Sequence, residues 1–163
     1  MSLNSLQDLF VEQLKDLYSA EQQFTEAQTK VAKAVSNSEL REGVTAHIEQ
    51  TKEQIARLKK VAEMLDLSSL TGKTCQAAKG LVAEAEELLS EDGDSAVKDA
   101  GIIASLQRVE HYEMAGYGTV VAYAKRLGHQ EVATLLEQTL EEEKATDAKL
   151  SQLAETSVNA QAV

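Results

Sequence analysis

Two acidic residues interrupt the longest apolar stripe of this sequence, and they constrain what the chain can fold into. Between residues 95 and 127 apolar side chains recur every three or four positions, which is typical of a helix with one buried face. Continuing this spacing through residues 106–118 places Glu110 and Glu113 on the buried stripe, followed by Gly116 or Tyr117. Because an unpaired charge is costly to bury, these acids need protons, basic partners or a metal.

The composition indicates an all-α protein. The 163 residues include no proline and only eight glycines, and good helix formers dominate. The net charge of −11 argues against binding to nucleic acid or to an anionic membrane surface. A single cysteine, Cys75, excludes an internal disulfide, and the sequence shows neither a signal peptide nor a membrane-spanning apolar run. We therefore expect a cytoplasmic protein that binds neither nucleic acid nor membranes.

Apolar periodicity predicts four long helices and one short helix. The long helices are expected near residues 5–35, 39–65, 95–127 and 130–154, and the short helix near residues 74–90. Short turns pair the long helices into two antiparallel hairpins, and a long connection that holds the short helix joins the hairpins. This arrangement is the ferritin-like four-helix bundle. We predict one such domain over residues 1–155 and a disordered tail at residues 156–163.

The buried stripes of the long helices carry polar residues at a similar height. Glu21 lies 16 residues before the first turn, taken at Asn37, and Glu113 lies 15 residues before the second turn, taken at Gly128. Glu143 follows that second turn by 15 residues. If the hairpins pack end to end, a rise of about 1.5 Å per residue brings these positions into one polar layer, with His47 slightly outside it and Asp147 at its border. The predicted metal ligands are Glu21, His47, Gln50, Gln54, Glu110, Glu113, Glu143 and Asp147.

Carboxylates from facing helices at one level are typical of a dinuclear iron or manganese site. Oxygen ligands and imidazole suit these metals, and shared carboxylates bridge two ions while cancelling their charge. Such a site would support oxidation of Fe(II) by oxygen or peroxide. Glu110 and Glu113 would be bridging or terminal ligands, Glu21 and Glu143 would be terminal, and His47 would bind metal or support a ligand. The alternative is a polar layer that only fixes helix register, without metal or catalysis.

Four segments carry a family resemblance: DLYSAEQ (16–22), HIEQTKEQIARL (47–58), VEHYEMA (109–115) and LEEEKATD (140–147). Together they resemble the YciE/YciF type of bacterial ferritin-like stress proteins, and the similarity extends over residues 6–154. The resemblance implies a ferritin-like bundle, a homodimer, a dinuclear metal site and an association with general stress responses. Two hypotheses follow: a stress-associated protein that binds iron or manganese, or a non-enzymatic stress-response dimer whose polar layer has lost or never had metal.

Two departures concern the second and fourth bundle helices. Ferritin-like di-metal proteins carry Glu-x-x-His on these helices, but here Glu143 is followed three residues later by Thr146, and the second helix also lacks the motif. The family more often has Glu at the position of Gln50, and a glutamine is a neutral, weaker ligand. The pair Glu110 and Glu113 does match the rubrerythrin-like pattern, in which the third bundle helix gives two carboxylates. The departures therefore leave three expectations: the site holds one metal ion, it binds metal weakly, or it has become a hydrogen-bonded polar layer.

Overall fold

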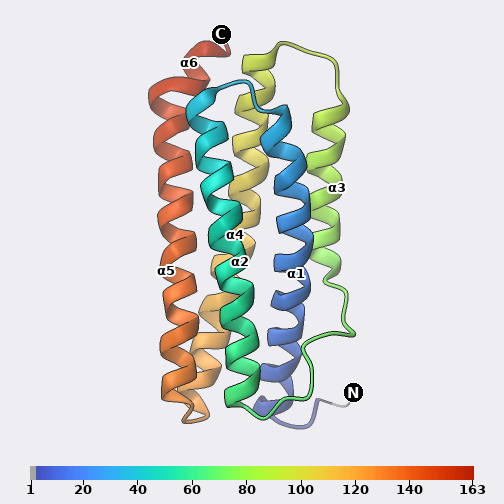
Figure 1. The fold of residues 1–163 in the computed structure, drawn as a ribbon, viewed down its shortest axis with the longest axis vertical. Coiled ribbons are helices and arrows are strands. Elements are labelled where there is room, and N and C mark those ends of the chain that lie inside the picture. Colours follow the sequence, from blue (N-terminus) through green and yellow to red (C-terminus); the bar gives the residue numbers. More distant parts are fainter. Residues whose placement is uncertain (1–2) are drawn as a thin grey trace.

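The computed structural model, which describes residues 3–163, confirms the all-α prediction (Figure 1). The helices are α1 (Leu6–Ala34), α2 (Ser38–Met64), α3 (Gln76–Ser90), α4 (Ser95–Arg126) and α5 (Gln130–Leu153), followed by a π-helical turn (Ala154–Val158) and α6 (Asn159–Gln161). Within this described range, no helix has the length and apolar character needed to cross a membrane. The first two residues of the predicted domain lie outside the described residues.

Four helices form the bundle, and the fifth lies on its outside (Figure 1). Helix α1 packs on α2 and α4, and α5 packs on α4 and α2, which closes a ring of antiparallel neighbours. After α2, residues 65–75 lead back along the bundle into α3, which packs on α1 and α4. This connection returns the chain to the end where α2 began, so that α4 runs parallel to α2. The predicted pair of hairpins and the helix in the crossover are both present.

Local sequence fixes the two hairpin turns. The side chain of Asn37 caps α2 by accepting a hydrogen bond of 3.0 Å from the backbone N–H of Leu40. The buried carboxylate of Asp99 on α4 accepts hydrogen bonds from the backbone N–H groups of Ser36 and Asn37 and from the Ser36 hydroxyl. At the other end Gly128 adopts a φ of +83° after α4, which glycine does without steric cost. These contacts set the length of each hairpin and hence the height at which its polar residues lie.

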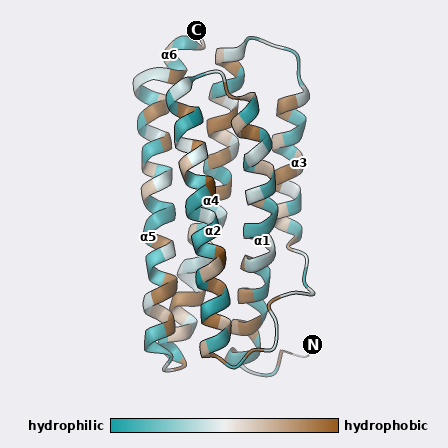
Figure 2. Ribbon diagram, in the orientation of Figure 1, coloured by the Kyte–Doolittle hydropathy of each residue, from teal (hydrophilic) through white to brown (hydrophobic). Residues whose placement is uncertain are grey.

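Apolar side chains fill the two ends of the bundle and leave a polar middle. One cluster includes Phe10, Leu14 and Val120, and the other, near the turn between α1 and α2, includes Val35 and Ile102. Apolar and polar residues alternate along each long helix (Figure 2), as expected for helices with one buried face. The buried polar side chains between the two clusters are those of Glu21, His47, Thr51, Gln54, Glu110, Glu113, Thr139 and Glu143.

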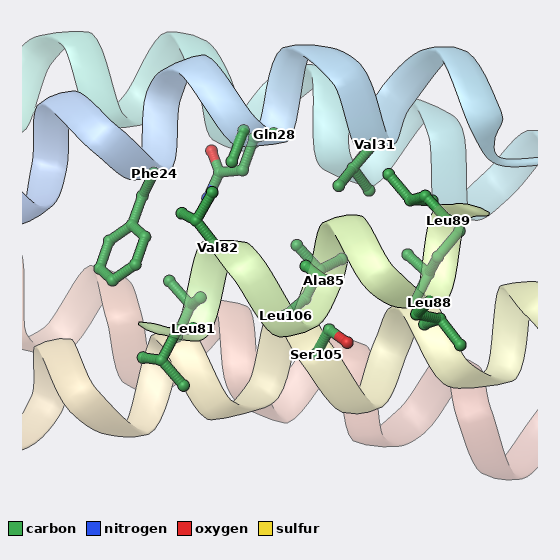
Figure 3. A pocket seen from close by; sticks show the side chains of 13 residues that line it. Phe24, Gln28, Val31, Leu81, Val82, Ala85, Leu88, Leu89, Ser105 and Leu106 are labelled. Carbon is green, nitrogen blue, oxygen red and sulfur yellow. The ribbon is translucent and has the colours of Figure 1, made fainter. Parts of the chain in front are cut away.

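The crossover helix α3 covers the seam between α1 and α4. A cavity of about 20 Å³ at this seam is lined by apolar side chains of all three helices (Figure 3). Gln28 of α1 also lines it, and its buried amide finds no hydrogen-bond partner among residues 3–163. At the start of α3, the Cys75 thiol lies 2.9 Å from the hydroxyl of Tyr112. The lone cysteine is thus a buried contact of the crossover with α4.

The C-terminal residues differ from the predicted disordered tail. Ala154–Val158 continues α5 as a π-helical turn, and Asn159–Gln161 adds one further helical turn. Val158 is 1% exposed and packs in the same apolar cluster as Val35 and Leu40. Burying this side chain favours an ordered chain end. The sequence did not predict the packing of Val158, because the segment is otherwise polar and a single apolar residue forms no periodic pattern.

Candidate metal centre

Four side chains from three helices converge at the middle of the bundle. His47 of α2, Glu110 and Glu113 of α4 and Glu143 of α5 each offer a ligand atom, and these atoms all lie within 4.8 Å of one another. All four residues are buried. Glu110 and Glu113 project from one face of α4 because residues three apart are neighbours on a helix surface. We call these four residues the central cluster; it combines oxygen donors with one imidazole.

The two ring nitrogens of His47 have different surroundings. Nε2 lies 3.3 Å from Oε1 of Glu110 and 3.9 Å from Oε2 of Glu143. Nδ1 lies 3.4 Å from Oε1 of Gln50 and 3.3 Å from Oγ1 of Thr146. A proton on Nδ1 donated to Gln50 leaves the lone pair of Nε2 directed at the carboxylates, as in metal-ligating histidines. The spacing placed His47 slightly outside the polar layer, whereas the structure places Nε2 within the central cluster.

Glu21 of α1 lies beside the central cluster. It is fully buried, and its Oε1 accepts a hydrogen bond from the hydroxyl of Tyr117 on α4. Burial raises the pKa of Glu21 to about 7, although the hydrogen bonds of Tyr117 and Glu113 act in the opposite direction. The structure therefore brings the predicted carboxylate of α1 to the same level as those of α4, with a tyrosine holding its orientation.

Burial and mutual repulsion favour protons on two carboxyl groups of the central cluster, those of Glu113 and Glu143. Burial raises the pKa of Glu113 well above its ordinary value, and the charges of Glu21 and Glu143 add to this effect. Burial also raises the pKa of Glu143 to about 11, reinforced by the proximity of the Glu110 carboxyl group. Burial alone would lower the pKa of His47, but its contact with Glu110 raises it. A cation that entered the cluster would therefore displace protons.

Several polar atoms of the central cluster lack a protein partner. Both carboxylate oxygens of Glu110 and of Glu143, and Nε2 of His47, have no aligned hydrogen bond within residues 3–163. Leaving one such buried atom unsatisfied costs about 1–3 kcal/mol. No lysine or arginine of the described chain forms an ion pair with these carboxylates; their ion-pair contacts are with His47. The donor set and its unmet charge fit a divalent cation.

Besides Gln50, which contacts Nδ1 of His47, two predicted ligands have other partners. Gln54 is buried, but its Nε2 donates a hydrogen bond of 3.1 Å to Oε2 of Glu142. Asp147 accepts a hydrogen bond of 3.0 Å from Gln107, and its Oδ2 lies 3.3 Å from Nε2 of His111. Asp147 thus faces the flank between α4 and α5, one turn beyond the central cluster. The structure does not bring it into the group of ligand atoms.

An ion pair that the sequence pattern did not predict joins α2 to α5 beside the central cluster. Arg57 donates two hydrogen bonds to the carboxylate of Glu142, at 2.9 and 3.0 Å, and a third to the hydroxyl of Thr139. Arg57 follows Gln54 by three residues, so both reach Glu142 from one face of α2. The three-residue spacing of Gln54 and Arg57, on a helix that packs against the acidic run at residues 141–143, could have indicated this ion pair. The pair closes one side of the centre with a bidentate contact.

Known proteins share both this sequence and this fold. The chain is 44% identical over 162 residues to Protein YciF of Escherichia coli (strain K12), and the match covers 99% of this chain and 98% of that protein. The crystal structure of the E. coli stress protein YciF has a TM-score of 0.92, covering 96% of this chain and 98% of that chain. YcfI from Rhodopseudomonas palustris has a TM-score of 0.89 at 42% identity, covering 92% and 95% of the two chains.

These matches confirm the ferritin-like bundle and the YciE/YciF resemblance that the four sequence segments indicated. Residues 5–163 match the family described as Domain of unknown function (DUF892). Because this match spans nearly the whole sequence, the chain belongs to the DUF892 family.

Proposed function

We propose that this protein binds iron or manganese at the centre of its bundle and serves in a stress response. The observation that carries the metal proposal is the central cluster: four buried side chains with ligand atoms within 4.8 Å of one another. The stress role is extended from YciF, which is described as a stress protein and is 44% identical to this chain. A homodimer in the cytoplasm remains part of this proposal.

The side chains around the centre have separate tasks in the proposed metal-bound state. Bound iron or manganese would supply redox chemistry with oxygen or peroxide. Tyr117 orients Glu21 through its hydrogen bond, and Gln50 keeps a proton on Nδ1 of His47 so that Nε2 is free to bind. The apolar clusters on both sides exclude bulk water from the ligands. The proposed ligands are His47, Glu110, Glu113 and Glu143, with Glu21 as a further terminal carboxylate.

Metal content and thermal stability test the proposal together. Protein purified without chelator and reconstituted with Fe(II) or Mn(II) should retain about one or two equivalents by elemental analysis. Because metal binds the folded state, its melting temperature should rise with metal concentration. Retention below about a tenth of an equivalent, with an unchanged melting temperature, would overturn metal binding.

A matched pair of substitutions tests the ligand assignment. Glu113→Gln should abolish metal uptake, because the buried carboxylate becomes a neutral amide. Glu141→Gln makes the same chemical change at an exposed residue of α5 and should leave uptake unchanged. Equal loss in both variants would contradict the assignment. Oxidation of Fe(II), followed by absorbance in the same two proteins, then shows whether the bound metal is redox active.

The contacts of Gln54 favour a second candidate, a polar layer that specifies helix packing. Its amide bonds to Glu142, which also holds Arg57, so this part of α2 uses its polar residues to bind α5. If the whole layer has only this role, neither metal content nor melting temperature responds to added Fe(II) or Mn(II). The reconstitution experiment therefore separates the two candidates.

A further inference from the structure

A groove opens between α2 and α5 on one side of the central cluster. It encloses about 460 Å³ and includes His47 and Glu110 in its lining. The lining of α2 runs from Glu39 to Gln50, which is the half of α2 nearer its N-terminus. On the other side of the cluster, Arg57 and Glu142 tie the same two helices together. We call this opening the α2–α5 groove.

The α2–α5 groove has apolar walls and a polar inner end. Its volume lies within the range of about 300–1,000 Å³ typical of small-molecule sites. Gln50 and Thr146 stand beside His47 and Glu110 at the inner end, and Lys149 lines the groove as an exposed residue. The apolar lining residues are Leu40, Val44, Ala46, Leu106, Leu150 and Leu153. This distribution fits a molecule with an apolar body and one polar end.

The inner end offers hydrogen-bond acceptors to such a molecule. Glu110 is fully buried, and both its oxygens lack an aligned hydrogen-bond partner within residues 3–163. A ligand hydroxyl could donate to one of these oxygens. A carboxylate head group would have to give up its hydration beside the buried oxygens of Glu110, where no lysine or arginine of the described chain forms an ion pair. A cationic head group would face His47, whose Nε2 already lies 3.3 Å from Glu110.

We propose that the α2–α5 groove binds a small organic molecule with an apolar body and a neutral hydroxyl head group that donates a hydrogen bond to Glu110. Alcohols, phenols and organic hydroperoxides form this class. The head group would lie beside the proposed metal ligands, so a part in catalysis rests on the proposed function. Binding in the groove does not require metal, because the walls and the acceptor belong to the chain itself.

Titration of the metal-free full chain with n-octanol tests the groove directly. Backbone amide NMR shifts should change along residues 39–50 and 146–156, which line the groove, and saturate with octanol concentration. Octanoate has the same length but a charged head group that would lose its hydration at the buried inner end, so it should bind at least about tenfold more weakly. Octanoate or octylammonium binding as tightly as octanol would overturn the proposed head-group chemistry.

Two glycines supply a matched pair for blocking the groove. Gly43 on α2 lines the groove, whereas Gly80 lies on α3; both are exposed, and a β-carbon on either meets no described atom within 4 Å. Phenylalanine is a better helix former than glycine, so both variants should fold. Gly43→Phe should weaken octanol binding at least about tenfold by occupying the groove, and Gly80→Phe should leave it unchanged. Circular dichroism checks the fold of both proteins.

Unchanged octanol affinity in Gly43→Phe would overturn the proposal. Size-exclusion chromatography gives a second outcome that would overturn the proposal. If Gly43→Phe dissociates an oligomer and Gly80→Phe does not, the groove is a contact between two copies of this chain. Because metal-free protein is used throughout, these titrations can be interpreted even if the protein binds no metal. Failure of octanol to bind would overturn the groove proposal and would leave the metal-uptake result intact.

Discussion

Gly116 of α4 packs against Leu17 of α1 beside the metal centre, so a single added methyl group tests this packing. A β-carbon on Gly116 would lie 2.6 Å from Cδ2 of Leu17. Favourable carbon–carbon contacts occur at about 3.5–4.0 Å. Leu17 is 2% exposed, so it can move aside only if its core neighbours repack. Gly118 lies two residues further along α4, and a β-carbon there meets nothing within 4 Å in the described structure.

The two positions separate helix propensity from packing. Replacing a helical glycine with alanine stabilises a protein by about 1 kcal/mol, and this gain applies to both variants. Over-packing costs about 1–3 kcal/mol and applies only at Gly116. Gly118→Ala should therefore gain about 1 kcal/mol, and Gly116→Ala should be about 1–3 kcal/mol less stable than Gly118→Ala. In a chain of this size each kcal/mol shifts the melting temperature by about 2–4 °C.

Thermal and urea denaturation of the metal-free variants, followed by circular dichroism, measures the difference. Leu17 lies one turn before Glu21, and Gly116 lies close to one turn after Glu113. Moving the two helices apart should therefore also weaken metal uptake more in Gly116→Ala than in Gly118→Ala. Equal melting temperatures for the two alanine variants would refute the close packing of α1 against α4.

Four further predictions follow from single features of the chain. Asp66 has a φ of +53° at the end of α2, so Asp66→Gly should raise the melting temperature, with a gain of about 1 kcal/mol. Asp99→Ala removes the acceptor of three hydrogen bonds from the turn between α1 and α2, and urea denaturation should show a loss of about 2–4 kcal/mol. Gln28→Met replaces a buried, unpartnered amide with an apolar side chain of similar size and should be neutral or stabilising by about 1 kcal/mol in the same assay. The pKa values of Glu21 and Glu143 rise from 4.5 to about 7 and about 11, so their protonated forms stabilise the fold fully below pH 4.5 and progressively less as pH rises through those values. Metal-free protein should accordingly melt at a lower temperature in mildly alkaline than in mildly acidic buffer, and the opposite slope would contradict the buried acid cluster.

The convergence of the carboxylates could be predicted because helical rise is nearly constant. Once the turns at Asn37 and Gly128 were identified, residue counts fixed the heights of Glu21, Glu113 and Glu143 along the bundle. The apolar stripe showed which residues face inward. Together these two patterns predicted acids from α1, α4 and α5 at one level, and in the structure Glu21 lies beside the cluster that Glu110, Glu113 and Glu143 form with His47.

The contribution of α2 could not be predicted in the same way. His47, Thr51 and Gln54 share one buried stripe, so spacing alone does not tell which of them reaches the centre. The choice depends on the rotation and tilt of α2, and on partners from the neighbouring helix. Glu142 draws Gln54 toward α5 through its pairing with Arg57, while His47 remains directed at Glu110. Contacts between side chains of different helices are not encoded in the periodicity of either one.

The neutral amide of Gln50 preserves the charge balance of the proposed metal centre. The ionised carboxylates of Glu21, Glu110, Glu113 and Glu143 carry four negative charges, which equals the charge of two divalent ions. A glutamate in place of Gln50 would add a fifth negative charge near Nδ1 of His47, from which Oε1 of Gln50 is 3.4 Å away. It would then favour the imidazolium, which cannot bind metal. The neutral amide instead accepts a hydrogen bond from Nδ1–H without adding charge, so the glutamine is compatible with metal binding through Nε2.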